Sequence, residues 1–129
     1  MAEAFPDLEI YVLKGDPDAL LAWLNADLGS MTVVSSKGDR QHWQWPNAQG
    51  VMDVYFNANA EKNLASVWFK QNHTPWSTDL DCARAAHAAL GTEVRCSLGG
   101  WQEEDDNSQA EATWMKLIHG QEKPFVWDK

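Results

Sequence analysis

Aromatic side chains that alternate with polar ones along predicted strands are the residues of this sequence best suited to bind a partner. The chain has eight tryptophans among 129 residues. Tryptophan and tyrosine bury a large apolar area and keep a polar group, so they serve both cores and interfaces. Successive side chains of a strand point to opposite faces of a sheet, so the position of each aromatic residue in its strand separates these two roles.

This alternation assigns Trp43 and Trp45 to the core, because they share one face of the predicted strand 41–45. The same rule sends nine side chains of five predicted strands to the opposite, outward face: His42, Gln44, Asp53, Tyr55, Ser66, Trp68, Arg95, Trp114 and Lys116. Two tryptophans and a tyrosine there exceed what solubility requires. We expect the face to bind through His42, Tyr55, Trp68, Arg95 and Trp114. Burial of the face beneath long loops is the alternative.

Catalytic, cofactor and metal motifs are absent from the sequence, so we expect no catalytic residues, no cofactor and no metal. The histidines lack His-x-x-x-His and His-x-His spacing. The acidic run 103–106 lacks the alternating ligands and the central glycine of an EF-hand loop, which favours a solvated loop. The enzymatic alternative is a pocket between sheet and helices that uses some of His42, His73 and Asp79.

Two helices can be predicted from their end signals. Asp16 and Pro17 suit the N-cap and first turn of a helix over 17–28, which Gly29 ends. Thr78 and Asp81 resemble a capping box for a helix over 79–90. The predicted strands are 8–13, 30–35, 41–45, 51–56, 64–69, 92–98, 112–118 and 124–127, with a polar loop over 57–63 and an acidic loop over 99–111.

These elements predict one α+β domain over residues 1–129, made of two strand–helix–strand halves. With two helices and about eight strands, most strands must join by hairpins, which predicts a largely antiparallel sheet with both helices packed on one face. Each helix ends in Leu-Gly before a strand, at Leu28-Gly29 and Leu90-Gly91. This repeat fits an internal duplication, but it is also the ordinary way in which a helix ends before a strand.

The formal net charge of −9 limits the partners. An acidic chain repels nucleic acid and anionic membranes, so we expect neither, and a basic protein partner would be attracted instead. Plain solubility is the alternative explanation. The first residues lack a signal peptide and no apolar run is long enough to span a membrane, so we expect a cytoplasmic protein whose Cys82 and Cys96 stay reduced.

Two functional interpretations remain. The first is a small, acidic, non-enzymatic protein-binding module, such as an inhibitor or immunity-type protein for a basic partner, with a homodimer as a further use of the same face. The second is a small enzyme or ligand-binding protein with a pocket between sheet and helices. A flat aromatic face favours the first and a deep polar pocket the second.

Overall fold

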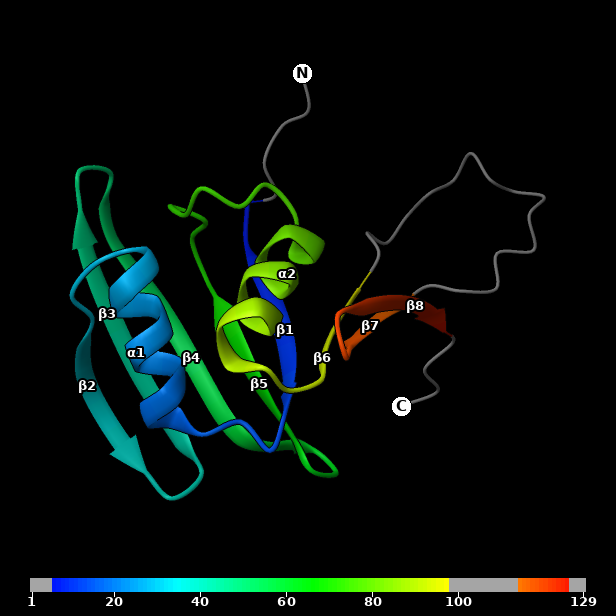
Figure 1. The fold of residues 1–129 in the computed structure, drawn as a ribbon. Helices are drawn as coiled ribbons and strands as arrows, with labels where there is room; N and C mark the ends of the chain where they lie inside the picture. The colour runs from blue at the N-terminus through cyan, green and yellow to red at the C-terminus, as the bar shows by residue number, and fades with distance from the viewer. Residues whose placement is uncertain (1–5, 98–113, 126–129) are drawn as a thin grey trace.

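The computed structural model describes residues 6–97 and 114–125, which form two helices and eight strands (Figure 1). In chain order these are β1 (Leu8–Leu13), α1 (Pro17–Asp27), β2 (Thr32–Lys37), β3 (Arg40–Asn47), β4 (Gly50–Glu61), β5 (Leu64–Phe69), α2 (Asp79–Leu90), β6 (Val94–Ser97), β7 (Trp114–Ile118) and β8 (Gln121–Phe125).

The strands form one sheet in the order β2-β3-β4-β5-β1-β6-β7-β8, and each neighbouring pair is antiparallel. The α+β class and the antiparallel sheet with two helices are therefore confirmed. The division into two strand–helix–strand halves is not confirmed, because β1 lies between β5 and β6 while β2 forms the far edge. Both helices lie on the same side of the sheet, α1 over the β2–β4 part and α2 over β5, β1 and β6 (Figure 1).

The helix ends follow the predicted capping chemistry. The Asp16 carboxylate accepts a hydrogen bond from the Ala19 amide at 3.3 Å, and the Thr78 hydroxyl accepts one from the Asp81 amide at 3.1 Å. Each bond satisfies an amide that has no partner within the first turn. Gly91 ends α2 in the left-handed conformation, which glycine adopts without steric cost.

Gly29 has a different role from the one expected of a helix stop. Its φ is +155°, and a Cβ built there would lie 2.7 Å from Trp45 Nε1. A larger residue would collide with this indole, which packs against the core from β3. The glycine therefore permits the end of α1 to approach the sheet closely.

Most of the core lies between the helices and one face of the sheet, whereas Tyr11 and Leu64, which are 7% and 3% exposed, are buried on the opposite face. It combines alternate residues of the central strands with the inner sides of both helices, for example Leu24, Trp43, Val67 and Ala86, all 0% exposed. Trp43 stacks on Phe56 with ring centroids 5.4 Å apart. The core also holds Cys82 and Cys96, which are buried free thiols.

The predicted loop over 57–63 is wrong, because β4 continues to Glu61. Its asparagine- and alanine-rich sequence has low strand propensity, but the β2–β3 turn holds it extended. The Ala58 amide donates to the Asp39 carbonyl at 2.8 Å, and Asn59 Nδ2 donates to the Asp39 carboxylate at 2.8 Å. Tertiary hydrogen bonds thus override local preference.

Two other strand positions also differ from prediction. The strand predicted over 30–35 spans Thr32–Lys37, because the Asn25 side chain accepts a bond from the Met31 amide at 2.7 Å and ties that residue to α1. The last strand begins at Gln121 rather than 124, after a two-residue turn in which His119 and Gly120 have φ of 52° and 76°. Such paired positive φ values suit the twist of a hairpin. The acidic loop over 99–111 lies outside the described residues.

The one-sided core predicts unequal costs for two truncations. Leu24→Ala should lower the free energy of unfolding by about 2–5 kcal/mol, because it leaves a cavity in close-packed surroundings. Trp68→Ala should lower the free energy of unfolding by a smaller amount, because Trp68 lies on the sheet face away from the helices and is partly exposed. Urea unfolding of dilute monomer measures both values. A larger loss for the tryptophan variant would contradict the placement of the core on one face.

Candidate binding surface

The sheet face opposite the helices, here called the open face, carries the side chains predicted to point outward. His42, Tyr55 and Trp68 occupy directly paired positions on β3, β4 and β5. Arg95 lies on β6 and pairs with Tyr11 of β1. The alternation that separated core from outward residues is therefore confirmed by burial and register, whereas binding by the outward set stays a prediction.

The rings of His42, Tyr55 and Trp68 form a continuous stack across three strands, here called the aromatic stack. The His42 and Tyr55 ring centroids are 4.5 Å apart with planes inclined by 11°, and those of Tyr55 and Trp68 are 5.5 Å apart with planes inclined by 30°. These separations match the spacing of neighbouring strands, about 4.8 Å. The rings therefore stand upright on the sheet, with faces toward one another and edges pointing away from the sheet.

A carboxylate at the base of the aromatic stack fixes its first ring. Asp53 Oδ1 lies 2.8 Å from His42 Nε2 and accepts a hydrogen bond from Gln44 Nε2 at 3.0 Å. Gln71 Nε2 donates to the other oxygen at 3.1 Å. Hydrogen bonds from Gln44, then His42 and Gln71, lower the pKa of Asp53 to about 2, because each stabilises the ionised form.

The Nε1 of Trp68 fixes the other end of the stack by donating to the Asp7 carboxylate at 2.8 Å. An indole held by a stacked ring and a hydrogen bond loses little further freedom on binding, and such preorganisation favours affinity. The stack is thus a rigid aromatic surface rather than a set of independent side chains.

A second aromatic group on the open face is formed by residues of β1, β7 and β8. Trp114 packs edge-on against Tyr11, with centroids 5.8 Å apart and planes inclined by 68°. The Arg95 guanidinium carbon and the Lys116 nitrogen lie 5.2 Å and 5.4 Å from the Phe125 ring centroid, within cation–π range. Arg95 also donates to the Glu93 carboxylate at 2.6 Å. The five predicted site residues therefore share one face but fall into two clusters.

Sequence reasoning missed Tyr11 and Phe125 as members of this surface. Strand alternation in 8–13 carries the signal for Tyr11, because Leu8, Ile10 and Val12 all point into the core. Phe125 gives no comparable signal, because its outward placement depends on the register of the β7–β8 hairpin, in which it pairs with Trp114.

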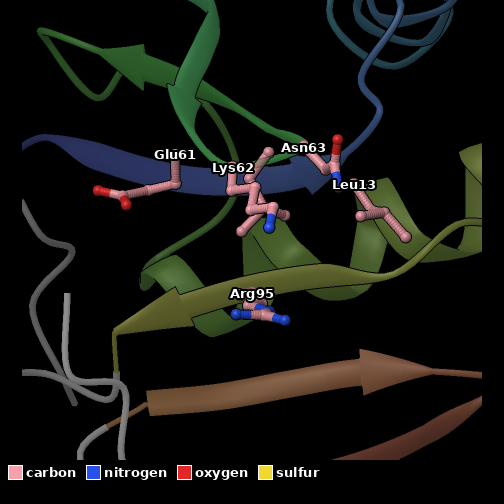
Figure 2. A pocket seen from close by; sticks show the side chains of 6 residues that line it. Leu13, Glu61, Lys62, Asn63 and Arg95 are labelled. Atoms are coloured by element: carbon pink, nitrogen blue, oxygen red, sulfur yellow. The ribbon is translucent and has the colours of Figure 1, made fainter.

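Two open depressions interrupt this face. One, of about 330 Å³, includes Glu9, Arg40, Tyr55 and Trp68 in its lining. The other, of about 280 Å³, is lined by Arg95 from β6, by Leu13 and by the end of the β4–β5 hairpin, including Glu61 and Lys62 (Figure 2). Both are smaller than or at the lower end of drug-sized sites, which suits side chains of a partner better than a sequestered substrate.

No hydrogen bond joins His42, His73 and Asp79, the residues of the enzymatic alternative, to one another. His42 contacts Asp53, while Asp79 at the start of α2 accepts a hydrogen bond from the Glu9 amide at 3.1 Å. His73 lies in the connection from β5 to α2, where its Nδ1 is buried and makes no hydrogen bond. Within residues 6–97 and 114–125, no group of three or more His, Cys, Asp or Glu side chains could hold a metal ion.

Comparison with known proteins gives no family for this chain, since no family model, curated protein or solved structure matches it. Neither described helix has the length and apolar character needed to cross a membrane.

The depressed pKa of Asp53 predicts a loss of stability in acid. A carboxyl group with a lower pKa in the folded state stabilises the fold above its unfolded pKa of about 4, and this contribution disappears as the pH falls toward 2. Asp53→Asn should remove this pH dependence. The urea midpoints of wild type and variant should therefore converge between pH 4 and 2. Asp18→Asn, at an exposed position of α1, is the control, and equal behaviour of both variants would contradict the assignment.

The raised pKa of Asp79 predicts the opposite dependence of stability on pH. Burial is the main cause that raises its pKa to about 6, so the folded state prefers the protonated carboxyl. Ionisation then costs stability as the pH rises from about 4 through 6. Asp79→Asn should stabilise the protein by about 1 kcal/mol at pH 8, after allowance for solvent screening, and by nothing near pH 4. Thermal unfolding at the two pH values measures this, and a destabilised variant at pH 8 would show that the ionised carboxylate is favourable.

Proposed function

We propose that this chain is a small non-enzymatic protein-binding module of the inhibitor or immunity type, with the open face as its contact surface. One observation carries the proposal. The aromatic stack and the group around Trp114 lie on the face that the helices leave uncovered in the described residues. Rigid aromatic side chains dominate binding hot spots because they desolvate large areas with few rotatable bonds.

The size of the open face supports this proposal. Eight strands at about 4.8 Å spacing give a width of about 34 Å. A specific protein interface commonly buries about 800 Å² on each partner, which such a face accommodates. The same area also suits a second copy of the chain, so the experiment must distinguish self-association from binding of a different protein.

The acidic balance of the whole chain supports a basic partner, which is attracted over distance. Two buried free thiols suit a reducing compartment, and we propose the cytoplasm as the site of action. We do not favour catalysis, because His42 and Asp79 contact different groups and the buried Nδ1 of His73 makes no hydrogen bond.

Site-specific cross-linking in the native cell tests the proposal. A photo-reactive amino acid in place of Ser66, between Asn57 and Tyr11 on the open face, should capture one protein partner. The same group in place of Ala88, exposed on α2, should not capture it. Capture of this chain itself would make the open face a homodimer interface, and capture only from Ala88 would contradict the proposal.

The captured partner, once purified, allows the anchors to be measured. Trp68→Ala should weaken binding by roughly 30-fold, mainly through faster dissociation, because a buried aromatic anchor contributes about 2 kcal/mol. Val33→Ala should leave binding unchanged, since Val33 is 48% exposed but pairs with Trp43 on the helix side of the sheet. Circular dichroism checks that both variants fold. Equal affinities for wild type and Trp68→Ala would remove the aromatic stack from the interface.

A further inference from the structure

A single row of paired positions crosses all eight strands of the open face and concentrates positive charge there. The successive members of this row, each paired with the next across neighbouring strands, are Lys37, Arg40, Asn57, Ser66, Tyr11, Arg95, Lys116 and Lys123. Five of the ten lysines and arginines of the chain thus fall in one line, here called the basic row. None of the acidic residues belongs to it.

We propose that the open face binds an acidic segment of a partner protein, which lies across the strands along the basic row. This inference rests on the proposed function and specifies the chemistry of the partner. It reverses the expectation from net charge, because the basic row holds five cations and no carboxylate although the chain as a whole is acidic.

Four of the five cations of the row make no ion pair with another described residue, whereas Tyr11 at the centre of the row is only 7% exposed. Lys37, Arg40 and Lys123 are exposed, and none of these three makes an ion pair with another described residue. The Lys116 nitrogen contacts only the Phe125 ring among the interactions observed in residues 6–97 and 114–125. Arg95 already pairs with Glu93, so the Glu93 carboxylate offsets its charge before a ligand binds.

The carboxylates of the open face are largely engaged. Asp53 accepts three side-chain hydrogen bonds and Asp7 accepts one from Trp68. Glu93 is held by Arg95 at 2.6 Å. Glu9 lies opposite Trp68, in the neighbouring row, and is the carboxylate closest to the path of the proposed ligand. These carboxylates, together with Glu61 in the depression beside Arg95, lie outside the row, so a partner that follows the row meets its cations first.

The orientation of the aromatic rings favours a protein over a single-stranded nucleic acid. Bases bind by stacking on free ring faces, but the faces of His42, Tyr55 and Trp68 are turned toward one another at 4.5 Å and 5.5 Å. The exposed ring edges carry the positive part of the aromatic quadrupole. Ring edges attract carboxylates, and the ring faces that are covered within the stack offer no platform for a base.

Local charge, rather than net charge, decides contact at physiological salt. The Debye length is then about 8 Å, so remote acidic residues are screened while the row touches the ligand directly. The free cations form two groups, Lys37 with Arg40 at one edge and Lys116 with Lys123 at the other. Five strand spacings separate Arg40 from Lys116, about 24 Å. An extended segment of about seven residues spans that distance, with acidic groups needed at its two ends.

Charge reversal at the row tests the inference. The probe is a fluorescein-labelled oligo-glutamate peptide of about ten residues, long enough at 3.3 Å per residue to cross the sheet. Binding is measured by anisotropy at physiological ionic strength, about 0.15 M, with wild type and two double variants, Lys37→Glu with Arg40→Glu and Lys116→Glu with Lys123→Glu. Each variant should weaken binding by about tenfold or more. Neutral Gln variants at the same four positions should show a smaller loss, and they keep the test valid if a reversal unfolds the chain.

The control variant has the same change in net charge. It combines Lys14→Glu with Lys70→Glu, two exposed positions outside the row. Lys14 is three residues beyond Tyr11 and Lys70 four beyond Ser66, about 10 Å and 13 Å along the strands. This variant should bind within about twofold to threefold of wild type. An equal loss in control and row variants, or no binding of the peptide by wild type, would overturn the inference.

Two further outcomes separate this inference from the proposed function. An oligo-thymidylate of matched length that binds more tightly, with the same row dependence, would replace the protein partner with nucleic acid. A captured partner whose binding weakens with Trp68→Ala but strengthens with row reversal would keep the protein-binding function and refute the acidic segment. A captured partner that responds to neither change would refute both.

Discussion

The placement of both helices on one face of an antiparallel sheet is the constraint on which the rest of this structure depends. Because side chains alternate along each strand, covering one face with helices commits every second residue to the core and every other residue to the open face. Leu24, Trp43 and Val67 fill the first set without exposure. The residues left on the other face can then be selected for contact rather than packing, and they include a stacked group of rings.

Register between strands, rather than any local motif, creates the candidate site. His42, Tyr55 and Trp68 come from three strands and meet only because the strands pair at those positions. The basic row arises in the same way from eight strands. Its sign differs from that of the chain, which shows why net charge describes long-range attraction and solubility but not the chemistry of a particular surface. The Asp53 hydrogen bonds hold the first ring in place and so connect the stability of this region to pH.

Sequence patterns predicted the helices and most of the strands because their signals are local. Asp16, Thr78 and Gly91 act at the helix ends as their chemistry requires, and alternation placed Trp43 inside and Trp68 outside. The extension of β4 through Ala58 and Asn59 was not predictable, because it depends on hydrogen bonds to Asp39 from another turn. The strand order and the basic row were equally inaccessible, since both follow from pairings between segments far apart in sequence. The outward residues could therefore be named in advance, but their grouping and local charge could not.

Hydroxyl-radical footprinting of the free protein tests most directly the central claim, that one face of the sheet is sealed and the other is accessible. Oxidation read out by mass spectrometry compares aromatic side chains on the helix side of the sheet with those on the open face. Trp68 and Tyr55 should be oxidised readily, whereas Trp43 and Trp23, which are 0% and 4% exposed, should be protected. Protection of Trp68 and Tyr55 equal to that of Trp43 would show that the face is covered in the free chain and would contradict the account.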